Sequence, residues 1–316
     1  MSFASEVKNE LARLEPEKEC CKLAEITGFL RVAGTVRLFG GGKYGIGIDT
    51  DNAAIARHYK KLLKSYFGVD PELAVGEPKN INLNKKKRYL LNIGPEEMSE
   101  QILRETGILF VKQGRDCFSE GIAPGIIKGK CCKKAFLRGA FLGAGTMSDP
   151  AKGYHLEISC KYQDTAGDIR KMVNTFEDLS AKVTLRKGKY VLYIKNAGYI
   201  RDTLAIMGAH SHVLLMDEIM IKRQFRGEAV RITNCDNANT DRALDASQAQ
   251  IDAINKLLKT GDYDSLPPKL REVAAARLAH PEYSLTQLGE ILDPPLKKSG
   301  VNGRIQKLME LATKIK

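Results

Sequence analysis

The sequence predicts an α+β fold in which two pseudo-symmetric α-β-β-α-β-β-α repeats are followed by a small all-α domain. Three observations support this prediction. One sixteen-residue segment occurs twice, similar strand and helix patterns follow both copies, and the last part of the chain has only helical patterns. With 316 residues and 43% hydrophobic content, the chain is long enough for two domains with their own cores.

The internal repeat is the strongest of these observations. Residues 20–35 (CCKLAEITGFLRVAGT) and 131–146 (CCKKAFLRGAFLGAGT) are identical at eight of sixteen positions. Residue frequencies of about 7% would give roughly one identity. Both segments predict a helix with small residues four positions apart, which lets two helix backbones approach closely: Ala24 and Gly28, and Ala135 and Gly139. We therefore predict that these helices pair and fasten the two repeats together.

The elements after each copy also correspond. Strands at 36–39 and 45–48 flank a glycine turn, a helix with one apolar face covers 51–67, and strands follow at 72–76 and 88–94. The second copy predicts a strand at 155–161, a helix at 165–179, a hairpin at 182–195 and a helix near 200–207. We place repeat one at about 16–115 and repeat two at about 127–219, after an N-terminal helical arm at 1–15.

Composition limits the partners of this chain. Lysine and arginine number 50 against 38 acidic residues, and the formal charge of +12 favours a polyanion such as nucleic acid. Tryptophan is absent and aromatic residues make up 7%, which argues against stacked bases and favours double-stranded DNA over RNA. We find neither an export signal nor a long uncharged apolar stretch, so we expect a cytoplasmic, nucleoid-associated protein with no membrane partner.

The repeated helices carry a resemblance to a known fold. The segments ITGFLRVAG (26–34) and LRGAFLGAG (137–145) resemble two degenerate LAGLIDADG helices of homing endonucleases. The resemblance implies paired helices at a domain interface, sheets that form a saddle over duplex DNA, and a metal-binding acid at the end of each active helix. Ala33 and Ala144 occupy those positions here, and alanine has no oxygen to bind a divalent cation. We expect no catalytic residues, no metal and no cofactor; the alternative is a live nuclease in which Asp149 substitutes.

The cysteines leave a second alternative open. The count of seven is odd and no C-x-x-C pair occurs, so neither a disulfide framework nor a zinc ribbon is indicated. Two adjacent pairs precede the repeated helices, Cys20 with Cys21 and Cys131 with Cys132. Because neighbouring side chains point in different directions and the usual spacer is absent, we expect reduced, buried thiols. The alternative is a metal site or a redox bridge.

Basic residues cluster where a saddle would meet phosphates. They precede one predicted strand and surround one predicted hairpin turn, and we predict secondary DNA contacts from them: Lys85, Lys86, Lys87, Arg88, Arg186, Lys187 and Lys189. The alternative is that they form solvated turns.

The final third predicts a helical domain. A polar segment rich in asparagine and aspartate at 220–240 predicts a linker, and a helical pattern resumes at 240–259. Pro267 and Pro268 begin the next helix, Ser284 and Gln287 form a capping-box pattern, and a basic last helix follows. Residues 266–292 hold three basic and three acidic residues, whereas 293–316 hold six and two. We predict a helix-turn-helix domain at 241–316; the alternative is an ordinary helical bundle.

The order of the elements and three segments, SLTQLGEIL (284–292), DPPLKKSGVNGR (293–304) and NCDNAN (234–239), resemble the WhiA family over nearly the full chain. That resemblance implies a DNA-binding transcriptional regulator of sporulation or of cell division and chromosome segregation. The DNA-reading candidates that it implies are Lys297, Lys298, Ser299, Asn302, Arg304, Gln306 and Lys307. One departure is Gly303, where the family is expected to have histidine.

Specificity is expected from the helix-turn-helix, while the saddle adds affinity or contacts a protein partner. We expect a monomer, since the internal pseudo-dimer removes the usual need for a second copy. The alternative function is a nucleoid-associated or protein-interaction module with weak sequence preference.

Overall fold

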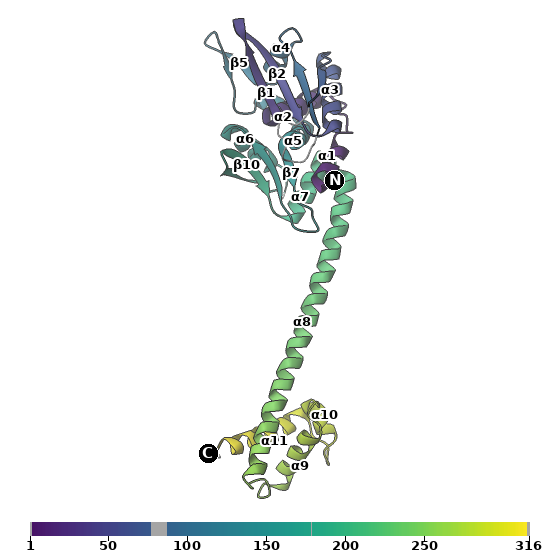
Figure 1. The fold of residues 1–316 in the computed structure, drawn as a ribbon, viewed down its shortest axis with the longest axis vertical. Coiled ribbons are helices and arrows are strands. Elements are labelled where there is room, and N and C mark those ends of the chain that lie inside the picture. Colours follow the sequence, from purple (N-terminus) through teal and green to yellow (C-terminus); the bar gives the residue numbers. More distant parts are fainter. Residues whose placement is uncertain (1, 77–86, 178, 315–316) are drawn as a thin grey trace. The chain divides into compact units, whose positions relative to one another are not determined.

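The structure of this chain is a computed structural model that describes residues 2–76, 87–177 and 179–314. The chain divides into two compact units, Met1–Arg223 and Gln224–Lys316. Figure 1 shows the elements of both units.

The N-terminal unit contains two copies of one element order. The first copy comprises α2 (Glu19–Ala33), β1 (Gly34–Phe39), β2 (Lys43–Thr50), α3 (Ala53–Phe67), β3 (Glu72–Gly76), β4 (Arg88–Ile93) and α4 (Ser99–Glu105). The second comprises α5 (Lys130–Ala144), β7 (Gly145–Met147), β8 (Leu156–Cys160), α6 (Gln163–Val173), β9 (Lys182–Arg186), β10 (Lys189–Ile194) and α7 (Ala197–Met207). The predicted α-β-β-α-β-β-α repeat is confirmed.

The two sheets have the same topology. Their strand orders are β1-β2-β4-β3 and β7-β8-β10-β9, and all described pairings within them are antiparallel. The β1–β2 turn uses Gly41 and Gly42, whose φ angles of 74° and 75° lie in the left-handed region that favours glycine. The predicted glycine turn is therefore confirmed at this hairpin.

Local sequence explains where α3 begins and ends. The Asn52 side chain accepts hydrogen bonds from the backbone of Ala54 and Ile55, and Gly68 ends the helix with φ of 73°. Between these caps, the predicted apolar face is buried: Ile55, Tyr59, Leu62, Leu63 and Phe67. This face packs the helix onto the core of the N-terminal unit.

Glycines let α2 and α5 pack backbone to backbone. A Cβ atom at Gly28 would overlap the carbonyl oxygen of Phe136, and one at Gly139 would overlap the carbonyl oxygen of Glu25. Ala24 and Ala135 are also buried at this interface. The predicted helix pair, α2 with α5, is confirmed (Figure 1). One hydrophobic core cluster includes buried residues of both repeats.

Further elements of the N-terminal unit lie outside the repeats. Helix α1 (Phe3–Leu11) buries Val7 and Leu11 in the same core, as the predicted N-terminal helical arm requires. Between the repeats, β5 (Leu109–Lys112) and β6 (Arg115–Phe118) form a two-stranded hairpin, and η2 (Pro124–Ile127) is a short 3-10 helix. The sequence patterns did not predict this hairpin.

The segment predicted as a linker is helical. Helix α8 extends without interruption over His210–Lys259. The prediction that helical structure resumes only near residue 240 is therefore wrong. No proline occurs within it, and asparagine or aspartate costs only up to about 0.7 kcal/mol per residue in a helix. Polar composition alone therefore does not break the helix. Its residues 221–237 are mostly exposed, outside the cores.

The C-terminal unit ends in three shorter helices, α9 (Pro268–Ala279), α10 (Leu285–Glu290) and α11 (Lys298–Lys314). The capping box predicted from Ser284 and Gln287 is present, with both reciprocal hydrogen bonds. Two small apolar clusters hold these helices together, and one of them includes Ile254 and Leu257 at the end of α8. No helix among the described residues is long and apolar enough to cross a membrane.

Candidate nucleic-acid interface

Helix α11 separates a buried face from an exposed polar face. Val301, Ile305, Leu308 and Ala312 are buried against α9 and α10, at the spacing of one helical face. This packing fixes the rotation of α11 about its axis. Its other side is thereby turned toward solvent.

Two close approaches fix the turn between α10 and α11. The Leu296 amide donates a hydrogen bond of 2.8 Å to the Gly289 carbonyl. A Cβ atom at Gly289 would overlap the carbonyl oxygen of Leu296, so only glycine fits there. Arg277 on α9 is buried and donates to the carbonyl oxygen of Tyr283 at 2.6 Å, which holds the preceding turn.

The predicted DNA-reading residues gather on one element. Lys297 directly precedes α11, and the others lie on its first three turns; exposed among them are Lys297, Lys298, Ser299, Asn302, Gln306 and Lys307. Arg304 differs from them because its guanidinium lies 3.6 Å from the Glu272 carboxylate on α9 and it is half-buried. Gly303 is exposed, and no heavy atom lies within 4 Å of the position where a Cβ would be.

The predicted secondary contacts lie at equivalent positions in the two sheets. Arg186, Lys187 and Lys189 surround the β9–β10 turn, whereas Lys87 and Arg88 lie where the β3–β4 connection enters β4. Lys85 and Lys86 lie outside the described residues. Because β3–β4 and β9–β10 are matching hairpins of the repeat, the two basic groups correspond by the internal symmetry.

Both arginines of these basic groups have acidic partners. The Arg88 Nε donates to Asp49 Oδ1 at 2.8 Å, and Arg186 Nη1 donates to Glu157 Oε1 at 3.0 Å. Lys87, Lys187 and Lys189 are exposed. These lysines are the better candidates for phosphate contacts, since an arginine in an ion pair must first give up its partner.

The ends of the paired helices carry the alanines singled out in the sequence. Ala33 and Ala144 are the last residues of α2 and α5, and both are half-buried. The Ala33 Cβ lies 3.1 Å from the Cβ position of Gly143, so the two helix ends meet. Asp149 is exposed, and its side chain accepts a hydrogen bond from the Ala151 amide in a local turn.

A buried charge network crosses the helix pair, and the sequence patterns missed it. Glu25 on α2 is fully buried; its Oε1 lies 2.7 Å from His58 Nε2, and its Oε2 accepts from Arg138 Nε on α5 at 2.9 Å. Arg138 also donates to the Met207 carbonyl at 3.2 Å. The sequence did contain a signal for this network. Glu25 is an acid within the apolar part of one repeated helix, and Arg138 is a base within the apolar part of the other.

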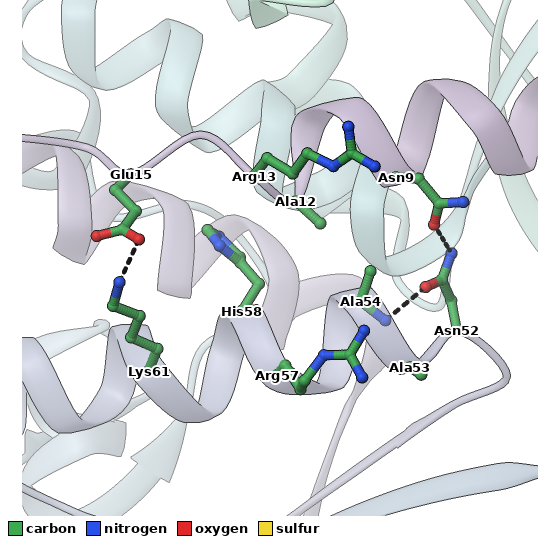
Figure 2. A pocket seen from close by; sticks show the side chains of 10 residues that line it. All are labelled: Asn9, Ala12, Arg13, Glu15, Asn52, Ala53, Ala54, Arg57, His58 and Lys61. Carbon is green, nitrogen blue, oxygen red and sulfur yellow. Dashed lines mark hydrogen bonds and ion pairs between the residues drawn. The ribbon is translucent and has the colours of Figure 1, made fainter.

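The same network borders a groove between α1 and α3 (Figure 2). The groove is lined by Arg13, Arg57 and His58, and Glu15 and Lys61 form an ion pair beside it. Asn52 donates to Asn9 at 2.8 Å across the groove and so joins the two helices. These contacts attach the N-terminal arm to the first repeat.

The paired cysteines converge at the opposite ends of α2 and α5. The sulfur atoms of Cys20, Cys21, Cys131 and Cys132 all lie within 4.8 Å of one another. The expectation that neighbouring cysteine side chains diverge is wrong, since the sulfur atoms within the pairs lie 4.0 and 3.9 Å apart. Burial raises the pKa of Cys21 to about 12, and a hydrogen bond with the Cys21 thiol lowers the pKa of Cys131.

Comparison with known families gives this arrangement a context. Three family models match the chain: the WhiA N-terminal LAGLIDADG-like domain over residues 19–109, the WhiA LAGLIDADG-like domain over 133–226, and the WhiA C-terminal HTH domain over 229–312. The chain belongs to the WhiA family. Both the predicted membership and the predicted fold, LAGLIDADG-type repeats followed by a helix-turn-helix, are confirmed.

Relatives of the WhiA family match over the full length. A protein named "Probable cell division protein WhiA" from Thermoanaerobacter pseudethanolicus is 42% identical, covering 100% of this chain and 98% of that one. One of the same name from Alkaliphilus metalliredigens is 40% identical over 99% of this chain and 98% of its own length. The crystal structure of full-length DUF199/WhiA from Thermatoga maritima matches with a TM-score of 0.59 and 25% identity, covering 99% of both chains.

Proposed function

We propose that this WhiA-family protein is a DNA-binding transcriptional regulator acting in cell division or chromosome segregation, or in sporulation. The names of its relatives support the cell-division role. Double-stranded DNA is the proposed partner, and α11 is the element that reads it. The proposal also retains a protein partner for the LAGLIDADG-like domain, a monomeric state and a nucleoid-associated location.

The observation that carries the proposal is the exposed basic face of α11. A helix-turn-helix places its second helix in the major groove, with the N-terminal residues of that helix toward the base edges. Lys297, Lys298, Ser299 and Asn302 occupy that end of α11 and are exposed, within the region that matches the family's HTH domain. Lysines there suit phosphates or guanine, and Asn302 has the amide donor and acceptor that suit adenine.

The proposed function excludes DNA cleavage. Metal-assisted phosphodiester hydrolysis needs carboxylates that hold the ion, and Ala33 and Ala144 end the two central helices. Incubation of the full chain with duplex DNA and Mg²⁺ or Mn²⁺ is expected to leave the DNA intact. Cleavage that depends on the added metal would contradict this part of the proposal.

Genomic capture tests the regulatory role directly. Sheared genomic DNA of the source bacterium is captured with the full-length protein at near-physiological salt, and the retained DNA is sequenced. Enrichment at a few promoters with a shared motif supports a site-specific regulator. Uniform recovery supports the nucleoid-associated alternative, and no recovery supports the protein-interaction alternative.

A matched pair of variants assigns the contact to α11. The double variant Lys298→Ala and Lys307→Ala is expected to lose the enriched sites and to lower the salt slope of log K by about 0.9 for each phosphate contact removed. Lys314→Ala removes an exposed charge from the last turn of the same helix, about 24 Å along the axis from Lys298, and is expected to bind normally. Arg304 is left intact because its contact with Glu272 ties it to the folding of the unit.

A further inference from the structure

The four cysteines at the start of α2 and α5 form a cluster that DNA binding does not explain. In each helix they occupy the second and third positions, after Glu19 in α2 and after Lys130 in α5. Cys21 and Cys132 are buried, whereas Cys20 and Cys131 are exposed, so the cluster is accessible from solvent. It is the one group of three or more metal-ligand side chains found together in the described part of the chain.

We propose that Cys20, Cys21, Cys131 and Cys132 bind one Zn²⁺ ion through their four sulfur atoms, which joins the two repeats at the start of their central helices. Two ligands come from each repeat. The site would therefore be a cross-link between segments that are 111 positions apart in the sequence. It is independent of the proposed DNA contacts.

The distances fit a tetrahedral ion. Four sulfurs at about 2.3 Å from a central zinc lie about 3.8 Å from one another. The sulfur atoms within the pairs already lie 4.0 and 3.9 Å apart, and no pair among the four exceeds 4.8 Å. No separation among the four has to shorten by more than about 1.0 Å to reach that value. A disulfide requires about 2.05 Å and joins only two of the four sulfurs.

Positive groups lie at the start of both helices, beside the cluster. Four thiolates around Zn²⁺ carry a net charge of −2, which positive groups nearby stabilise. Neither α2 nor α5 has a side-chain cap at its N-terminus, and the positive ends of both helix dipoles lie at the cluster. Lys18 and Lys130 stand at the beginnings of the two helices, and the Lys18 charge acts on Cys131.

The absence of a two-residue spacer is compatible with this site. In common zinc sites, the spacer lets one chain turn so that two thiols point to the ion. Here adjacent cysteines in a helical first turn already present sulfur atoms at that separation, and the close packing at Gly28 and Gly139 brings the second pair to meet the first. The internal repeat supplies two cysteines from each copy, so four ligands meet without a spacer inside either pair.

Zinc binding to the full chain tests the proposal. The protein is purified under reducing conditions and stripped of metal with a chelator, and Zn²⁺ is then titrated in competition with a chromogenic chelator. We expect one Zn²⁺ per chain and a higher Tm with zinc than without. Replacing zinc by Co²⁺ should give the absorption of a tetrahedral ion with sulfur-to-cobalt charge transfer.

Cysteine variants locate the site. Cys20→Ser and Cys131→Ser remove exposed ligands and are expected to weaken Zn²⁺ binding by more than the about 10- to 100-fold that loss of an outer-shell partner costs. Cys235→Ser, at an exposed cysteine of α8, is the matched control and should bind like the unchanged protein. Circular dichroism of the zinc-free forms checks that the variants are folded.

Three results would overturn the proposal. The first is folded protein that takes up no stoichiometric zinc or binds another metal in its place. The second is equal zinc affinity in the Cys20→Ser, Cys131→Ser and control proteins. The third is a disulfide between these cysteines, found by mass spectrometry in protein that binds no zinc after reduction.

Discussion

Glu25 is a buried carboxylate whose partners come from both repeats. Breaking a buried ion pair by removing one partner is costly, because the remaining charge stays buried without compensation. Glu25→Ala would leave Arg138 in that condition and would remove the buried hydrogen-bond partner of His58. We expect the variant to lose about 3–5 kcal/mol of unfolding free energy, measured by urea denaturation of the full chain.

An exposed acid on the same helix is the control for Glu25. Glu19 pairs with Lys22 on the surface of α2, and such pairs contribute about 1 kcal/mol or less. Glu19→Ala should therefore change the unfolding free energy by about 1 kcal/mol at most. Similar losses in the two variants would mean that the buried network does not hold the repeats together.

Gly139 tests the close packing of α2 on α5. In Gly139→Ala, the added methyl group would overlap the carbonyl oxygen of Glu25, so the helices must separate. We expect a loss of about 1–3 kcal/mol or more, as for overpacked cores. Gly167→Ala in α6 is the control, because no heavy atom lies within 4 Å of its Cβ position; it should gain about 0.5–1 kcal/mol. Denaturant unfolding gives both values, and a stable Gly139→Ala protein would contradict the packing.

At the scale of the element, helix α11 has a packed apolar face but also contains a glycine, which lowers its helix propensity. Gly303 lies within this helix, and its Cβ position is free of neighbours. Gly303→Ala is therefore expected to stabilise the C-terminal unit by about 1 kcal/mol, through the helix propensity of alanine. Thermal and denaturant unfolding measure the gain, and DNA affinity is measured in parallel.

The opposite effect on stability is expected when the glycine of the preceding helix α10 is replaced by alanine. Gly289→Ala places a methyl group onto the Leu296 carbonyl oxygen and should destabilise the turn before α11. If Gly303→Ala is stabilising but binds DNA much more weakly, then Gly303 serves a close approach to DNA. If it is not stabilising, the exposed position assigned to Gly303 is wrong.

Elements were predictable where periodicity and caps agree. The repeat was visible as identity between two segments, and the α3 face and the capping box at Ser284 were visible because each depends on residues close together in the chain. The β5–β6 hairpin was not, because its short strands expose most of their residues and show no alternation of apolar and polar residues. The 220–240 segment was predicted to be a linker from composition, but helix continues wherever no proline or stronger competing structure stops it.

Side-chain partners across the repeats could not be predicted from local patterns. The Glu25–Arg138 pair joins positions 113 apart, and its members are not at equivalent positions of the repeat, so internal symmetry did not suggest it. The convergence of the cysteines follows from the packing at Gly28 and Gly139, which fixes the alignment of α2 against α5. The exposure of Lys298, Ser299, Asn302, Gln306 and Lys307 followed from the apolar spacing of α11, whereas the contact of Arg304 with Glu272 did not.

At the scale of the whole molecule, the open question is whether the sheets add to DNA binding. The two basic groups occupy matching hairpins, and a net charge of +12 favours phosphate contacts from more than one domain. We predict that a variant with Lys87→Ala, Lys187→Asn and Lys189→Ala binds duplex DNA more weakly, with a salt slope lower by up to about 2.7. Lys187 has a φ of 49°, in the left-handed region that asparagine adopts more readily than alanine. Asparagine is therefore used at this position.

A matched variant separates specific contacts from loss of net charge. Lys61→Gln, Lys64→Gln and Lys171→Gln also remove three charges, but from exposed positions on α3 and α6, the helices packed against the two sheets. Fluorescence anisotropy at several salt concentrations gives the slope for each protein. If both triple variants behave alike, the effect is one of overall charge; if neither changes the slope, α11 binds without the sheets. A lower slope for the hairpin variant alone would mean that the LAGLIDADG-like domain still contacts DNA through the ends of its sheets.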